Sequence, residues 1–289
     1  MAHRSALYVP AANRRALAKT LDLQADIVIA DLEDAVGPEE KDNARQNLRH
    51  HFQMLKGSAK PVIRINMTSS EWFADDLALC LELQPRAILL PKVNSPADIR
   101  DLDQFLDDAD CDPELKIWAM IETPRGILNI TAIAELGLTP ARRLEAFVVG
   151  TNDLAKETGV ALTPFREHMH PWLMQIVLAA RAAGLIALDG VSNDFRDLDA
   201  LEEQCRQSVN MGFDGRTIIH PAQVDTANRV FSPSKDEVAS ARAIVDAFER
   251  EENRNKGVIA LNGKMVERLH RDMALRLLAR ATQTTNGES

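Results

Sequence analysis

Two carboxylates stand where apolar runs of the sequence end. The run at residues 118–121 is followed by Glu122, and Pro124 and Gly126 then interrupt it. Proline disfavours helix at the residue before it, and glycine permits backbone geometry that other residues avoid, so Glu122 is predicted at the tip of a buried strand. A second run, at residues 146–149, ends shortly before Asp153. Because divalent cations prefer oxygen ligands, Glu122 and Asp153 are predicted to bind one.

Polar residues follow most of the other apolar runs as well. They are Asp31, Glu33, Asp34, Arg64, Asn66, Lys92, Glu122, Arg125, Asn152, Asp153, Asp189 and His220. Arg64 suits the carboxylate of an anionic substrate, and Asn152 is a further candidate for substrate binding. Glu33 and Asp34 are candidate catalytic residues, although Glu33 could instead support Arg64 and Asp34 could equally cap a helix. His220 is interpreted as part of a packed turn.

The elements that must position these residues alternate regularly. Eight apolar runs are predicted as strands, at residues 5–10, 26–31, 61–66, 86–91, 116–121, 145–149, 185–189 and 215–220. Helices are predicted between them at residues 13–21, 38–52, 70–83, 95–106, 127–135, 164–183 and 197–211. Continuously apolar strands are typical of a parallel sheet that is buried on both faces. The pattern predicts an α/β TIM barrel with its chemistry at the carboxyl ends of the strands; a doubly wound open sheet is the alternative.

The pattern changes after the eighth predicted strand. We expect a catalytic barrel domain at residues 1–231 and a helical extension at 232–289. The extension is predicted to contain a helix at 234–252, a loop or short hairpin at 256–265 and a final helix at 266–281. The polar tail at 283–289 is predicted to be disordered.

Composition excludes several classes of protein. The chain has 289 residues and a net charge of −9, which argues against a nucleic-acid-binding protein. No stretch approaches the ~20 apolar residues of a membrane helix, and the charged N-terminus runs directly into a predicted strand, so a cytoplasmic location is expected. The three cysteines fit no metal or disulfide spacing.

Several motifs together resemble a known family. They are RSALYVPAANR at 4–14, DLEDAV at 31–36, RIN at 64–66, PKV at 91–93, ETPRG at 122–126, GTNDL at 150–154, DGV at 189–191 and GFDGRTIIHPAQ at 212–223. In this order they resemble the citrate lyase β-subunit-like CoA-ester lyases of the HpcH/HpaI aldolase superfamily. The likeness runs from about residue 4 to residue 270.

The resemblance implies a TIM barrel with a C-terminal helical extension. It implies Mg²⁺, with Mn²⁺ as the alternative metal, at Glu122 and Asp153, and a substrate carboxylate or carbonyl at Arg64. Arg14 and Lys19 match the basic region that meets the phosphates of coenzyme A. The resemblance also implies a homotrimer or homohexamer in which the C-terminal segment covers a neighbour's active site.

The C-terminal motif departs from the family pattern. Many lyase members have Gly-x-Met-Ile/Val-Asp there, whereas residues 263–267 read GKMVE, so Glu267 adds a methylene to the expected acid. This form looks closest to the malyl-CoA thioesterase branch. The leading expectation is Mg²⁺-dependent retro-Claisen cleavage of a 3-hydroxyacyl-CoA such as malyl-, citramalyl- or citryl-CoA, with Glu267 protonating the enolate. The alternatives are hydrolysis of the malyl-CoA thioester and a non-catalytic subunit that binds a CoA ester.

Overall fold

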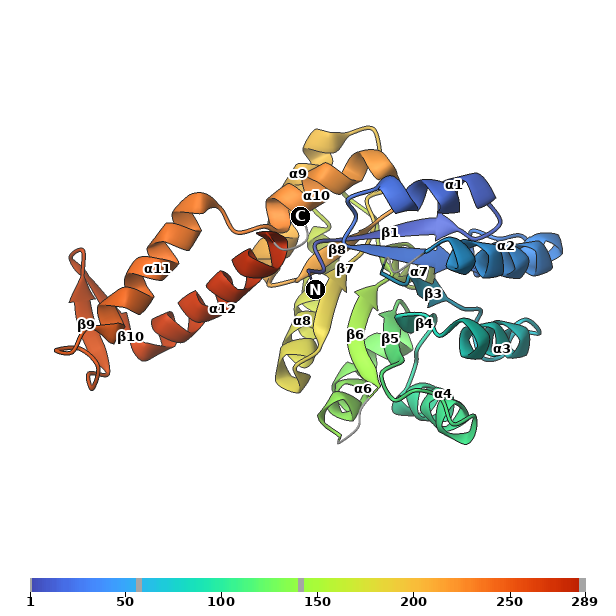
Figure 1. Cartoon of the computed structure of the whole chain (residues 1–289), viewed down its shortest axis with the longest axis horizontal. Helices are drawn as coiled ribbons and strands as arrows, with labels where there is room; N and C mark the ends of the chain where they lie inside the picture. The colour runs from blue at the N-terminus through green and yellow to red at the C-terminus, as the bar shows by residue number, and fades with distance from the viewer. Residues whose placement is uncertain (1, 56–58, 140–142, 286–289) are drawn as a thin grey trace. The chain divides into compact units, whose positions relative to one another are not determined.

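The computed structural model describes residues 2–55, 59–139 and 143–285. The chain divides into two compact units (Figure 1). One holds residues 3–228, and the other holds residue 2 and the described residues from 229 onward. The division falls within α10 (Val224–Phe231).

Eight parallel strands close into a barrel in the first unit (Figure 1). The strands are β1 (Ser5–Pro10), β2 (Ile27–Asp31), β3 (Val62–Arg64), β4 (Ala87–Leu90), β5 (Lys116–Ile121), β6 (Leu144–Val149), β7 (Ile186–Asp189) and β8 (Gly215–Ile218). Each strand pairs with the next, and β1 pairs with β8. The predicted TIM barrel is therefore confirmed, and the open-sheet alternative is wrong.

Helices follow the strands and pack around the barrel. They are α1 (Arg14–Lys19), α2 (Lys41–Met54), α3 (Phe73–Leu83), α4 (Pro96–Asp108), α5 (Pro124–Leu128), α6 (Ile130–Glu135), α7 (Thr151–Thr158), α8 (His170–Ala183) and α9 (Leu198–Met211). Short 3₁₀ turns are η1 (Thr20–Asp22), η2 (Pro38–Glu40), η3 (Leu136–Leu138), η4 (Glu167–Met169) and η5 (Pro221–Gln223). Inward-facing side chains, with Trp118 the largest, fill the interior. The barrel is thus a packed core that presents its strand ends to the loops.

Helix α7 was not predicted from the sequence. It starts one residue after β6 and ends at Thr158, and the next residue, Gly159, has a φ of +75° that suits glycine. The segment is short and mostly polar, so it shows little apolar periodicity. As a consequence, Asn152 and Asp153 lie in the first turn of a helix rather than in a loop. The eighth strand also ends earlier than predicted, and His220 caps η5 instead of ending β8.

The second unit contains two helices and a hairpin. These elements are α11 (Lys235–Glu249), β9 (Val258–Leu261), β10 (Lys264–Glu267) and α12 (Arg268–Thr285). Phe248 packs on Ile259 and Val266, while Val245 packs on Ala274. The unit therefore has small buried clusters of its own.

The hairpin corrects the predicted final helix. Val266 and Glu267 belong to β10, and the helix begins only at Arg268. Asn262 and Gly263 both have positive φ, as the tight turn between two antiparallel strands requires, and they set the register that extends β10 to Glu267. Of the tail predicted to be disordered, residues 283–285 lie in α12 and residues 286–289 lie outside the described residues.

Two expectations from composition can be compared with the structure. All three cysteines are free and buried. Within the described residues, we find no helix with the length and apolar character needed to cross a membrane.

The seam between β1 and β8 depends on a glycine. Gly215 starts β8 in the strand register that pairs Arg216 with Ser5. A Cβ at Gly215 would lie 1.6 Å from the backbone oxygen of His3, a separation that no side-chain adjustment can relieve. Closure of the barrel at this point therefore requires the absence of a side chain.

We predict that Gly215→Ala lowers the free energy of unfolding by about 1–3 kcal/mol or more, because the backbone must move to admit the methyl group. Gly37→Ala is the matched control, since nothing lies within 4 Å of a Cβ there. Urea denaturation measures both variants. Equal midpoints for Gly215→Ala and the wild type would contradict this reading of the seam.

Candidate active site

Arg64 is fixed by the carboxylate of the neighbouring strand. Asp31 ends β2 and Arg64 ends β3, and the two residues are partners in the strand register. The guanidinium donates from Nε to Asp31 Oδ1 at 2.7 Å and from Nη2 to Oδ2 at 2.5 Å. Burial opposes the charge of Arg64, but Asp31 outweighs it and holds the pKa of Arg64 above its ordinary value. This bidentate pair orients the guanidinium and keeps it charged.

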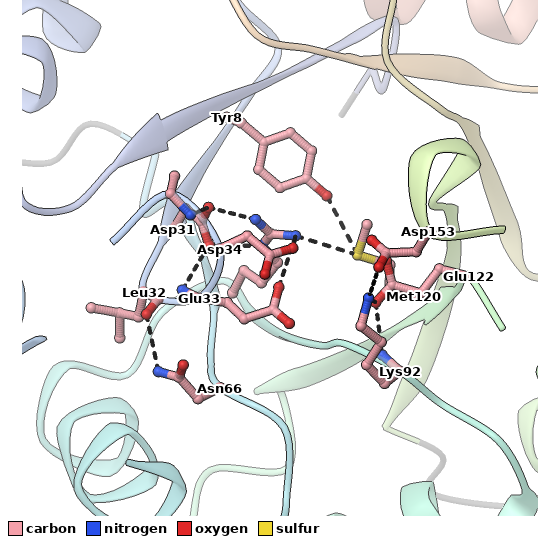
Figure 2. Close-up of polar contacts among 12 residues, drawn as sticks. Tyr8, Asp31, Leu32, Glu33, Asp34, Asn66, Lys92, Met120, Glu122 and Asp153 are labelled. Atoms are coloured by element: carbon pink, nitrogen blue, oxygen red, sulfur yellow. Dashed lines mark hydrogen bonds and ion pairs between the residues drawn. The ribbon is translucent and has the colours of Figure 1, made fainter. Parts of the chain in front are cut away.

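Four further residues surround the Arg64 guanidinium, namely Glu33, Asp34, Met120 and Tyr8, and Figure 2 labels all four. Glu33 Oε2 lies 3.0 Å away as an ion pair, and the exposed Asp34 lies at 3.9 Å. The Met120 sulfur is 3.8 Å from Nη1, and the Tyr8 ring lies 4.9 Å from the guanidinium carbon. Burial raises the pKa of Glu33 to about 7, against the opposing effect of Arg64. The Arg64 guanidinium therefore lies against the Tyr8 ring and the Met120 sulfur. Glu33 pairs with it from within the site, and the exposed Asp34 lies at the edge.

Lys92 joins the two carboxylates that the sequence singled out (Figure 2). Its backbone N–H donates to Glu122 Oε1 at 2.8 Å, and its ammonium lies 3.5 Å from the same oxygen. The ammonium also forms an ion pair with Asp153. Lys92 adopts φ 53°, an uncommon conformation for a residue with a side chain, and such conformations cluster at functional sites. Glu122 and Asp153 therefore converge on one cationic group.

Glu122 is fully buried at the end of β5. Burial raises its pKa to about 8; Lys92 opposes the shift, whereas Glu33 and Asp153 add to it. Its Oε2 atom has no hydrogen-bond partner within the described part of the chain. Gly150 lies so close that a Cβ there would be 2.4 Å from that oxygen. The carboxylate is thus held in a tight space with one oxygen unused.

These residues fit a divalent cation. Mg²⁺ is usually bound by one or two carboxylates, and it keeps water or substrate oxygens as its remaining ligands. Glu122 supplies a buried oxygen without a hydrogen-bond partner in the described part of the chain. Asp153 lies close to Glu122, because both carboxylates pair with the Lys92 ammonium. Residues 2–55, 59–139 and 143–285 contain no group of three or more His, Cys, Asp or Glu side chains arranged as a metal site. The remaining ligands would therefore come from water or from substrate.

Three other residues predicted at strand ends, Asn152, Asp189 and His220, have different contacts in the structure. The amide of Asn152 exchanges hydrogen bonds with Asn193, at 3.1 and 2.9 Å, which ties α7 to the loop after β7. Asp189 accepts from Arg166 and from Ser208 on α9, so its carboxylate is engaged on the helix side of the barrel. The ring of His220 stacks on Phe195, with ring centres 4.4 Å apart, as a packed turn would have it.

The predicted coenzyme A residues lie on the surface of α1. Arg14 and Lys19 are exposed, and Arg14 Nη2 is 2.7 Å from His50 Nε2. Glu267 belongs to the second unit, where it ends β10 half-buried. Its backbone N–H donates to His270 Nδ1 at 2.9 Å, so the turn into α12 is fixed while the carboxylate is left out of that bond.

Sequence reasoning missed several residues that build the site. Asp31 was predicted only as one of the polar residues at strand ends, although it is the main partner of Arg64, and Tyr8 and Met120 were not predicted. Asp31 could have been found by aligning the ends of the second and third strands, because paired strand ends bring their side chains together. Nothing in the local sequence around Tyr8 and Met120 distinguishes them from core residues.

The chain is similar in sequence and in structure to several known proteins. The family model described as HpcH/HpaI aldolase/citrate lyase matches residues 4–221. The (3S)-malyl-CoA thioesterase of Cereibacter sphaeroides is 44% identical over 96% of this chain and 94% of its own. Citrate lyase subunit beta of Escherichia coli is 31% identical over 96% and 93%. The crystal structure of Mycobacterium tuberculosis CitE with magnesium, acetoacetate and coenzyme A has a TM-score of 0.79 at 29% identity, covering 97% and 98% of the two chains.

We predict that Gly150→Ala weakens binding of Mg²⁺ or Mn²⁺ by about tenfold or more, because the added methyl group displaces the Glu122 carboxylate. Isothermal titration calorimetry with each metal measures the affinity. Gly37→Ala again serves as the control, since its added methyl group meets no atom within 4 Å. Wild-type affinity in a folded Gly150→Ala protein would show that Glu122 does not bind the metal.

Proposed function

We propose that this chain, which belongs to the HpcH/HpaI aldolase/citrate lyase family, binds a 3-hydroxyacyl thioester of coenzyme A at its barrel mouth and cleaves it. The reaction that we favour is hydrolysis of malyl-CoA to malate and free coenzyme A. The observation that supports this function is that Glu122 and Asp153 both pair with the Lys92 ammonium, at the barrel mouth that also holds Arg64.

Each candidate residue has a part in binding the substrate. Glu122 and Asp153 would hold Mg²⁺, which supplies a Lewis acid for a substrate oxygen when it is bound. Arg64 would pair with the malyl carboxylate, since a planar guanidinium matches that group in two places. Asn152 would donate to the substrate from the first turn of α7. Arg14 and Lys19 would meet the coenzyme A phosphates.

Hydrolysis requires a base for water. Glu267 would take a proton from a water molecule whose oxygen bonds to the thioester carbonyl carbon. The carbon–sulfur bond then breaks, and the proton returns to the departing sulfur of coenzyme A. We propose that Glu267 reaches the barrel of a neighbouring subunit in a homotrimer or homohexamer, through the extension at residues 232–289.

The relatives favour hydrolysis over the cleavage that the sequence first suggested. The malyl-CoA thioesterase matches this chain at 44% identity, whereas the citrate lyase subunit matches at 31%. Both matches extend over 96% of the chain, so the comparison is like for like.

Carbon–carbon cleavage is the second candidate, supported by the match to citrate lyase subunit beta. Here Glu33 or Asp34 would accept the proton of the substrate hydroxyl, and the bond between the hydroxyl carbon and its neighbour breaks. The products are glyoxylate and the enolate of acetyl-CoA, and Glu267 would protonate the enolate carbon. Arg64 would stabilise charge on the developing carbonyl.

One incubation separates these functions. Purified protein, Mg²⁺ and (3S)-malyl-CoA are combined, and malate, free coenzyme A, glyoxylate and acetyl-CoA are followed together. Malate with free coenzyme A would support hydrolysis, and glyoxylate with acetyl-CoA would support cleavage. Binding of the thioester without any product would support a non-catalytic subunit and overturn both reactions.

We predict that Glu122→Gln lowers kcat by ~10³-fold or more in excess Mg²⁺, because loss of the metal's polarisation removes several kcal/mol of transition-state stabilisation. The substitution keeps the side-chain shape, so the fold should survive. Glu82→Gln, at an exposed position on α3, is the control. Near-normal turnover by Glu122→Gln would refute the role of this carboxylate.

We predict that Glu267→Gln lowers kcat by about 10²- to 10⁴-fold, since it removes a general base while KM changes little. Glu267→Asp restores the shorter side chain of the lyase pattern and should raise the share of glyoxylate among the products. The exposed Glu249→Gln is the control. An unchanged rate in Glu267→Gln would place the base elsewhere.

A further inference from the structure

Lys41 is a buried cation outside the metal and Arg64 clusters. It begins α2 and is 4% exposed. Its ammonium donates to Leu32 O at 2.6 Å, to Glu33 O at 2.9 Å and to Asn66 Oδ1 at 2.7 Å. A lysine ammonium has three N–H donors, so all of them are engaged. The ammonium also lies 4.8 Å from the centre of the Trp72 ring.

The backbone acceptors of Lys41 belong to the loop that carries Glu33. This loop joins Asp31, the bidentate partner of Arg64, to the exposed Asp34. Glu33 O also accepts from Val36 N at 3.1 Å, so Lys41 binds the loop where it turns. Fixing these two carbonyl groups fixes the direction in which the Glu33 side chain leaves the backbone, towards Arg64 Nη1.

A second row of buried polar groups holds Lys41 in place. Asn66 accepts from Lys41 and donates from its amide to Leu32 O at 3.0 Å and to Asp76 Oδ2 at 2.6 Å. Asp76, which is fully buried, accepts in turn from Arg45 Nη1 at 2.8 Å. The network therefore connects α2 and α3 to the loop after β2 and to the residues after β3.

Burying an ammonium is costly, and here its direct acceptors are carbonyl and amide oxygens rather than carboxylates. An apolar side chain of similar length could fill the same space without that cost. The presence of a buried lysine at this position is explained by its two hydrogen bonds to the loop, because an apolar side chain cannot donate to the carbonyl groups of Leu32 and Glu33. With its donors engaged, Lys41 has none left for a substrate.

We infer that Lys41 is a positioning residue for the reaction: its ammonium fixes the backbone of Leu32 and Glu33, so that the Glu33 carboxylate is held against Arg64, the residue proposed to bind the substrate. This inference rests on the proposed function for its catalytic consequence. Its structural part concerns the loop alone and can be measured without turnover.

Lys41→Met tests the inference, because methionine matches the aliphatic stem of lysine while it removes the ammonium and its three donors. We expect kcat to fall by about 10- to 100-fold, as for other groups that orient an active-site side chain. Mg²⁺ affinity should stay within about twofold, since the Lys41 ammonium donates to neither Glu122 nor Asp153. Lys60→Met, at an exposed lysine that donates to Gln84 O, is the control.

Two further measurements separate positioning from a general loss of stability. Hydrogen exchange of the backbone amides at residues 33–36 should quicken in Lys41→Met and stay unchanged in Lys60→Met. Lys41→Ala deletes the atoms of n-propylammonium, and this cation should restore kcat in Lys41→Ala but not in Lys41→Met, where the space is filled.

The outcomes are distinct. Wild-type kcat and unchanged exchange in a folded Lys41→Met protein would overturn the inference, as would failure of n-propylammonium to restore Lys41→Ala. If the wild type turns over no CoA thioester, the proposed function fails by itself. Faster exchange at residues 33–36 in Lys41→Met would then still support the structural part.

Discussion

The barrel mouth gathers more negative than positive charge, and the site depends on how that excess is held. Asp31, Glu33, Asp34, Glu122 and Asp153 supply five carboxylates around two cations, Arg64 and Lys92. With all groups ionised, the sum is 2 − 5, or −3, so a divalent cation would offset most of the excess negative charge. Burial raises the pKa of Glu33 and of Glu122, as expected where carboxylates are desolvated near one another. A bound Mg²⁺ would relieve that repulsion, so electrostatics and ligand chemistry favour the same ion.

Closure of the barrel brings these charges together. Asp31 and Arg64 are 33 positions apart in sequence and meet because β2 and β3 pair in register. Lys92 and Glu122 meet in the same way, since β4 and β5 are neighbours. Gly150 then lets the start of α7 approach Glu122 closely enough for Asp153 to share the same cation. The site is therefore specified by strand register and by one missing side chain.

The polar residues at strand ends could be predicted from the sequence, whereas the side chains that contact them in the folded chain mostly could not. The bounds of the fifth strand, 116–121, agree with β5, because that run is long, apolar and closed by Glu122 and Pro124. Helix α7 was missed because its eight residues bury little apolar surface, and its role is to present Asp153. Lys41 could not be distinguished from a surface lysine, since its acceptors are backbone oxygens that come near it only in the folded chain. Glu267 was placed in a helix because the turn at Asn262 and Gly263, which extends β10, leaves no apolar pattern.

Hydrolysis and carbon–carbon cleavage place similar demands on the barrel. In both proposed reactions Arg64 would be the cation for a substrate oxygen, and Glu122 and Asp153 would hold the metal. They differ in the atom that the final acid–base group must reach, which is water at the thioester carbonyl in one case and the enolate carbon in the other. Glu267 ends a hairpin whose tight turn and backbone bond to His270 fix its Cα, so one methylene more or less changes the reach of its carboxyl group directly. With its backbone fixed in this way, the Glu267 side chain would determine by its length which of the two proposed reactions of the same bound substrate occurs.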